Sequence, residues 1–92
     1  MHLIDVTNTY RHLVEKRLST TDSKYVKVYS LGNTTVVYSD SNQQIEAVLE
    51  NKDRQLRDEE IEFVIKRLFP KNISYDLTVD VNRHVIAITA LK

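Results

Sequence analysis

The sequence predicts a small α+β domain, in which an antiparallel sheet carries two helices packed on one of its faces. Residues 24–31, 34–39, 73–81 and 84–91 are rich in strand-forming residues, and in 73–81 apolar and polar residues alternate as in a half-buried strand. Apolar residues recur every three to four positions, as in amphipathic helices, in about residues 7–18 and 58–69. Short turns join the strands in pairs, which predicts two hairpins and therefore antiparallel pairing. This combination is the α+β arrangement.

The composition fits one ordered domain over residues 1–92. Hydrophobic residues make up 41% of the chain and charged residues 28%, with one glycine and one proline. Such a chain can bury a core, although a domain of this size buries only a modest one. The density of Val, Ile, Leu and Tyr argues against disorder.

The first helix is expected over residues 7–18, where one stripe consists of Tyr10, Leu13, Val14 and Leu18. Thr7 or Asn8 could cap it by accepting a hydrogen bond from a free backbone amide. The second helix, 58–69, has a stripe that consists of Ile61, Val64, Ile65 and Leu68. Acidic residues begin this helix and basic residues end it, in the sense that the helix dipole favours, and Pro70 stops it.

The glycine of the chain, Gly32, lies between the first two strands, where a two-residue type II′ turn needs a positive φ. Such a turn sets the register, with Leu31 opposite Thr34, Tyr29 opposite Val36, and Lys27 opposite Tyr38. Because this glycine is used by the turn, none remains for a phosphate-binding loop.

Residues 41–57 have two interpretations. Ile45, Val48, Leu49 and Leu56 fit a helix, whereas Ile45, Ala47 and Leu49 alternate as a further strand. A single helix from 41 to 69 is disfavoured, because its apolar stripe would have to change phase before Ile61. We therefore expect a fifth strand at 44–50, followed by a loop.

The last two strands are expected to form a hairpin around Asn82 and Arg83, with Asn82 tolerating the positive φ. In the first of them, the core-facing positions are predicted to be Ile73, Tyr75, Leu77, Val79 and Val81. The last strand is apolar on both sides. Its second face carries Val85, Ala87 and Leu91.

Neither a catalytic motif nor a cofactor or metal motif is evident. The chain has no cysteine, and His2, His12 and His84 lack the i, i+4 spacing of a helical metal site. No Ser lies in a nucleophile elbow. The sequence therefore favours a protein that is not an enzyme, although a site assembled only in three dimensions stays open as an alternative.

Charge and hydropathy further narrow the range of possible partners and locations. The formal net charge is zero, so nucleic acid is not a favoured partner. Residues 40–62 nevertheless hold eight acidic and three basic residues, an acidic segment in an otherwise basic chain. No apolar run is long enough to span a membrane and no secretory signal is visible at the start. We expect a cytoplasmic protein, in keeping with the absence of cysteine.

Four residues are candidates for an interaction surface. Phe63 lies on the polar side of the second helix, and an aromatic residue there could anchor a partner. Val85, Ala87 and Leu91 could do the same on the last strand. The partner would be a second copy of the chain or another protein; alternatively, the chain itself covers these side chains.

An alternative surface is the face of the first hairpin that carries Tyr25, Lys27, Tyr29 and Tyr38. Tyrosine rings beside cations can stack single-stranded nucleic acid. The other interpretation is that the rings belong to the core and only their hydroxyls reach water.

Two segments, 34–40 (TTVVYSD) and 59–70 (EEIEFVIKRLFP), resemble a small family of uncharacterised cytoplasmic proteins from low-GC Gram-positive bacteria. The resemblance covers most of the chain. It implies a bacterial cytosolic setting and no activity, cofactor or site residue. The function that the sequence favours is a non-enzymatic interaction or regulatory module that associates with itself or with another protein.

Overall fold

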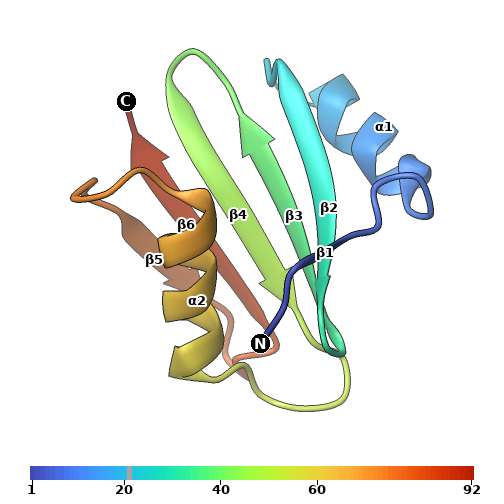
Figure 1. Cartoon of the computed structure of the whole chain (residues 1–92), viewed down its shortest axis with the longest axis vertical. Coiled ribbons are helices and arrows are strands. Elements are labelled where there is room, and N and C mark those ends of the chain that lie inside the picture. Colours follow the sequence, from blue (N-terminus) through green and yellow to red (C-terminus); the bar gives the residue numbers. More distant parts are fainter. Residues whose placement is uncertain (21) are drawn as a thin grey trace.

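The computed structural model describes residues 1–20 and 22–92, which form an antiparallel sheet flanked by helices (Figure 1). Within these residues the sheet has six strands in the order β1-β2-β3-β4-β6-β5. The elements are β1 (Ile4–Asp5), α1 (Arg11–Thr20), β2 (Tyr25–Leu31), β3 (Thr34–Asp40), β4 (Gln44–Glu50), α2 (Asp58–Leu68), β5 (Asp76–Val79) and β6 (Val85–Leu91). The predicted α+β class is confirmed.

The strands β2, β3 and β4 form a meander, and the register between β2 and β3 is the predicted one. Leu31 pairs with Thr34, Tyr29 with Val36 and Lys27 with Tyr38. Gly32 has φ +60, and Asn33 is not among the residues at positive φ, which is the pattern of a type II′ turn. The fifth strand expected at 44–50 is present as β4 and pairs with β3.

The helices lie on opposite faces of the sheet, which corrects the expectation that both pack on one face. The reason is that β2 is apolar on both sides. Leu31 joins the core under α2, whereas Val26 and Val28 form a second core with Val14 of α1. In Figure 1, α1 accordingly lies beside β2, and α2 lies over β6.

Helix α1 begins at Arg11, four residues later than predicted. Thr7 does not act as its cap. The hydroxyl of Thr7 donates to Asp5 Oδ1 over 2.6 Å and accepts from the Val28 amide over 3.1 Å, which ties the chain to the β1–β2 edge. Helix α2 follows its prediction closely, and Pro70 lies just beyond it.

The second hairpin is shorter than predicted and lies at the sheet edge. Its positive φ belongs to Arg83, at 57, and not to Asn82. Strand β6 lies inside the sheet, between β4 and β5, and β5 forms the edge opposite β1. Of the five side chains expected to face the core from β5 and its flanks, Ile73 packs partly buried against the main core. The other four are exposed: Tyr75 45%, Leu77 44%, Val79 45% and Val81 99%.

Candidate functional site

A buried polar network joins the first residues of α2 to the meander. The carboxylate of Glu60, only 3% exposed, accepts hydrogen bonds from both Arg54 guanidinium nitrogens at 2.7 and 3.1 Å. It also accepts from the Thr34 hydroxyl at 2.6 Å and from the Arg57 amide at 3.0 Å. The Asn51 side-chain amide donates to the same Thr34 oxygen over 3.1 Å. Every member is satisfied, which a buried polar network requires.

This network holds Glu60 in its charged form. Burial by itself would raise the pKa of the carboxyl, but the hydrogen bonds from Arg54, Thr34 and the Arg57 amide outweigh burial and lower it to about 2. A carboxylate with such a low pKa is a poor general base at neutral pH. The network therefore serves to anchor the loop 51–57 and the start of α2.

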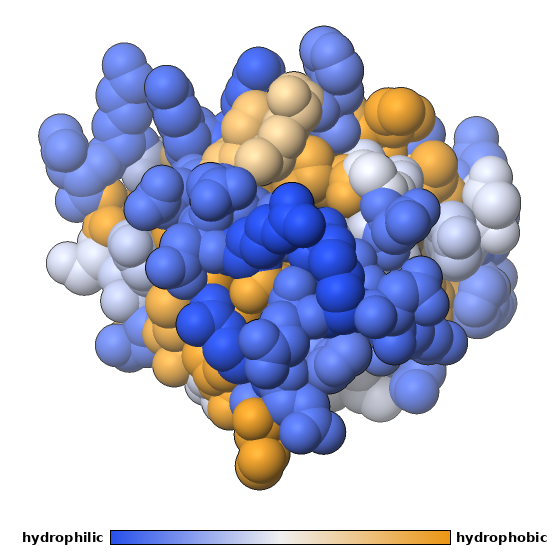
Figure 2. All heavy atoms as spheres, turned by 90° about the horizontal axis from the view of Figure 1, so that it is seen from below, coloured by the Kyte–Doolittle hydropathy of each residue, from blue (hydrophilic) through white to orange (hydrophobic). Residues whose placement is uncertain are grey.

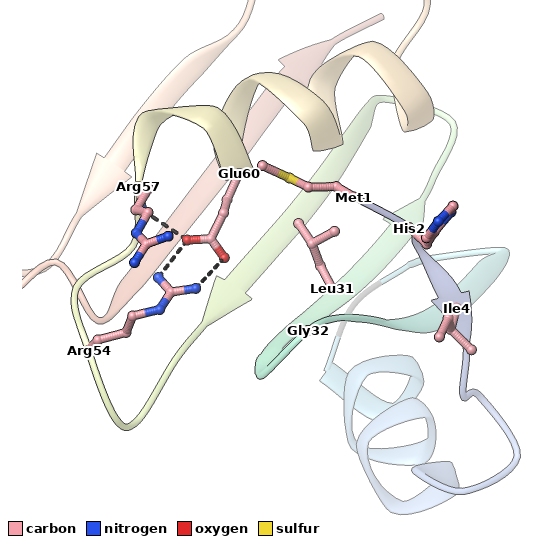
Figure 3. A pocket seen from close by; sticks show the side chains of 8 residues that line it. All are labelled: Met1, His2, Ile4, Leu31, Gly32, Arg54, Arg57 and Glu60. Carbon is pink, nitrogen blue, oxygen red and sulfur yellow. Dashed lines mark hydrogen bonds and ion pairs between the residues drawn. The ribbon is translucent and has the colours of Figure 1, made fainter.

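A pocket of about 420 Å³ opens next to this network (Figure 3). Its lining consists of Met1, His2, Ile4, Leu31, Gly32, Arg54, Arg57 and Glu60. In Figure 3 the Glu60 carboxylate turns toward Arg54, and the His2 imidazole lies at the far side of the pocket, beside β1. The two titratable groups are thus not arranged as an acid–base pair.

The end of the molecule that carries this pocket is mostly polar. Figure 2 views it from below, and hydrophilic residues cover its middle while hydrophobic residues form separate patches toward the rim. In the described part of the chain, no three His, Cys, Asp or Glu side chains gather in a way that could hold a metal ion.

Phe63 lies on the flank of α2 that faces the meander. Glu60, one turn earlier on the same flank, contacts Thr34 of β3. The ring is partly buried against the main core, and the Arg67 guanidinium lies 5.1 Å from its centroid. The chain therefore covers much of Phe63 itself, which was one of the alternatives from sequence.

Val85, Ala87 and Leu91 lie on the opposite face of the sheet from Phe63, so the structure does not bring the four candidates onto one surface. The three point to the side that carries α1, but α1 packs mainly against β2 and β3. Along β6, the side chains under α2 are buried. On the α1 side, Val85 and Ala87 are half-buried, and Leu91, at the end of the strand, is 72% exposed.

We call this surface of β4, β5 and β6, on the α1 side, the open face. The strand registers place one row across the sheet that consists of Val37, Val48, Ala87 and Thr78. The row on one side includes Glu50 and Asp80, and the row on the other side includes Glu46 and Asp76. An apolar strip is thus bordered on both sides by carboxylates.

At the α1 edge of the open face, Glu46 forms an ion pair with Arg17. The neighbouring hollow of about 200 Å³ is lined by Leu13, Lys16, Arg17, Thr20, Val37 and Val48. The apolar strip therefore continues from β6 toward the side of α1 as a shallow depression.

The tyrosine side chains of the first hairpin gather on the α2 side of the sheet. Tyr25 meets Tyr38 edge to face with ring centroids 6.0 Å apart, and Lys27 Nζ lies 5.8 Å from the Tyr25 centroid. Tyr29 and Tyr38 pack against the main core, and burial, together with neighbouring Tyr25, raises the pKa of Tyr29 to about 12. Lys27 also pairs with Asp5 at 3.2 Å. The cation on this face is therefore neutralised locally.

One exposed apolar surface was not predicted, namely the edge strand β5. The alternation of Tyr75, Leu77, Val79 and Val81 was visible in the sequence. The sequence did not reveal that this strand is outermost, because that depends on which strand pairs with β4.

Residues 1–90 match a family described as a domain of unknown function, DUF1827. The chain belongs to the DUF1827 family. A crystal structure described as a conserved protein of unknown function from Streptococcus thermophilus LMG 18311 is similar over 100% of this chain and 97% of that one, with 32% identity and a TM-score of 0.84.

A comparison with curated proteins gave no significant match. The family resemblance expected from sequence is thereby established as membership of DUF1827, whose description assigns no activity. Among the described residues of this DUF1827 protein, no helix combines the length and the hydrophobicity needed to cross a membrane.

Proposed function

We propose that this DUF1827 protein is a non-enzymatic protein-interaction module, and that its open face binds a basic amphipathic segment of another protein. The observation that carries this is the apolar row through Val48 and Ala87, bordered by carboxylates on both sides. Burying apolar side chains would supply the driving force, and complementary charge would set orientation and specificity.

The charges also indicate which partner the open face does not suit. Two copies of it placed face to face would set Glu50, Asp76 and Asp80 against the same carboxylates, which opposes association. A partner with an apolar stripe flanked by Lys and Arg avoids this repulsion. An amphipathic helix presents such a stripe.

The test is a photo-crosslinking amino acid at Ala87, with a matched one at exposed Glu15 on α1. We expect position 87 to crosslink one discrete protein that position 15 does not. Glu50→Lys should weaken that crosslink and Glu15→Lys should not. Equal products from the two positions, or a Glu50→Lys crosslink of full strength, would contradict the proposal. A crosslinked product that contains only this chain would show that the partner of the open face is a second copy and not a basic protein.

The nucleic-acid alternative has less support. Tyr25 and Lys27 are arranged as a stacking platform would need, but Asp5 pairs with the lysine and Asp40 borders Tyr38. A platform neutralised in this way lacks the basic groove typical of single-strand binders. We expect no gel shift with single-stranded DNA or RNA at low salt, and a shift abolished by Lys27→Ala would restore the alternative.

The setting that we propose is the cytoplasm of a low-GC Gram-positive bacterium. The absence of cysteine supports a reducing compartment. The similarity to a Streptococcus thermophilus protein supports the bacterial origin. Fractionation of cells that produce the protein would test the location.

A further inference from the structure

The strand β5 is an exposed sheet edge. It pairs with β6 on one side only, and it forms the outer edge of the sheet beside α2 in Figure 1. On the α2 side, Tyr75, Leu77 and Val79 are each nearly half exposed. No proline interrupts the strand. Edges pair readily with another strand unless they are short, charged or covered. Strand β5 is short, and Asp76 in it and Asp80 just beyond it restrict the pairing to registers that keep the carboxylates apart.

The backbone groups that β5 leaves free follow from its register. The Asp80 amide donates to the Val85 carbonyl over 3.1 Å, and Val79 pairs with Ile86 next to it. In an antiparallel ladder, alternate residues direct their amide and carbonyl groups to the same neighbour. Asp76, Thr78 and Asp80 therefore face β6, and the N–H and C=O groups of Leu77 and Val79 face outward.

Two copies of β5 related by a two-fold axis perpendicular to the sheet could pair in a few registers. An axis at Asp76 would place its carboxylate opposite itself. An axis at Thr78 would place Asp76 opposite the partner's Asp80. Both set like charges directly opposite, which is destabilising.

An axis at Val79, the last residue of β5, would pair Thr78 with Asp80 and Leu77 with Val81, so every pair except Val79 itself would reach beyond the strand. An axis at Leu77 avoids both repulsions and keeps Asp76, Leu77 and Thr78 paired within the strand. It places Asp76 opposite the partner's Thr78 and Tyr75 opposite the partner's Val79. Leu77 would meet itself as a hydrogen-bonded pair, which its outward amide and carbonyl allow. The apolar side chains of both copies would gather on the α2 side of a continuous sheet.

We infer that the partner at the β5 edge is a second copy of this chain, paired antiparallel about Leu77. An isologous contact of this kind closes as a dimer. Because a four-residue edge is a small contact, the dimer should dissociate on dilution. The inference goes beyond the proposed function, since the pairing uses the free backbone edge of β5, whereas the open face is the α1 side of the sheet and stays exposed in the dimer.

Sedimentation velocity over a dilution series tests the association. We expect a dimer at high concentration that is lost in Leu77→Lys, because two ammonium groups would meet across the axis. Val81→Lys, at a 99% exposed position just beyond the strand, is the matched control and should keep the dimer. Circular dichroism checks that both variants are folded.

Disulfide crosslinking of single-cysteine variants tests the register, because the protein has no cysteine of its own. Opposed residues of a hydrogen-bonded pair have Cα atoms about 5.5 Å apart, within the range of a disulfide. Under mild oxidation we expect Leu77→Cys to form a linked dimer and Asp76→Cys and Thr78→Cys to form none. This result would hold even if Leu77→Lys failed to fold.

A wild-type chain that stays monomeric at the highest concentration would overturn the inference. So would a dimer that is linked through position 76 or 78 instead of 77. Neither result would affect the crosslink expected from Ala87, so the two proposals fail separately.

Discussion

The Arg54 guanidinium holds the Glu60 carboxylate with two hydrogen bonds, at 2.7 and 3.1 Å, where the chain turns from the meander into α2. Asn51 extends this arrangement into the loop, because its side-chain oxygen accepts from the amides of Asp53 and Arg54. One buried carboxylate thereby organises the connection between β4 and α2.

Replacing Glu60 by glutamine should destabilise the fold. The amide keeps the shape but loses the charge that Arg54 pairs with, so we expect a loss of about 2 kcal/mol in the free energy of unfolding. Urea denaturation measures it. Glu59→Gln, at an exposed neighbouring position, is the control and should change little. Equal stabilities of the two variants would show that the network is not stabilising.

The same carboxyl should make stability depend on pH. Its pKa in the folded protein, about 2, lies below its ordinary value of 4.5. The stabilisation is therefore complete above about pH 4.5 and is lost as the pH falls toward 2. Urea denaturation across this range should show a smaller loss for Glu60→Gln than for the wild type.

Some acid sensitivity should remain in that variant. Hydrogen bonds from Thr7 and Lys27 also lower the pKa of Asp5 to about 2. Identical pH profiles for the wild type and Glu60→Gln would contradict the role assigned to Glu60.

Gly32→Ala should cost about 1–2 kcal/mol. A Cβ at this position would meet no atom within 4 Å, so the cost comes from the positive φ alone. Asn33→Ala, the next turn residue, has a negative φ and should be nearly neutral. Thermal denaturation compares the two, and an unchanged melting temperature for Gly32→Ala would show that the turn can change its type.

Phe63→Ala should destabilise the monomer without changing its association. The ring is half-buried against the core, so we expect a loss of about 1–2 kcal/mol, less than for a fully buried Phe. Sedimentation velocity should show the same dimerisation as the wild type. If the variant kept its stability but no longer associated, Phe63 would be part of the interface between the two copies.

Local signals were sufficient to predict much of this fold. Gly32 fixed the first hairpin because a two-residue turn permits one register, and Pro70 marked the end of α2. The strand at 44–50 could be chosen because the helical phase fails before Ile61. Each of these inferences depends on residues that are close in sequence.

Features that depend on distant contacts were not predictable in the same way. The valines Val26 and Val28 showed that β2 has a second apolar face, but not that α1 would cover it. The alternation around Leu77 showed a strand, but not that it is outermost. These outcomes depend on the order of strands, which no local pattern encodes.

The Glu60 network was missed although a signal was present. Glu60 precedes Val64 by four residues and therefore shares the buried side of α2. In the sequence, Glu60 also belongs with Asp58 and Glu59 to the acidic run that begins the helix, which hides its separate role. Its partner Arg54 is in a loop, where no hydrophobic periodicity predicts the direction in which a side chain points.

The strand order has a consequence for how the chain assembles. The meander β2–β3–β4 closes through loops of two or three residues, whereas β6 reaches β4 only after residues 51–84 have been placed. Closing short loops costs less entropy, and distant pairings form late. During synthesis the meander can therefore form first, with β4 as its temporary unpaired edge. Until β6 leaves the ribosome, that edge is where a nascent chain is most open to mispairing.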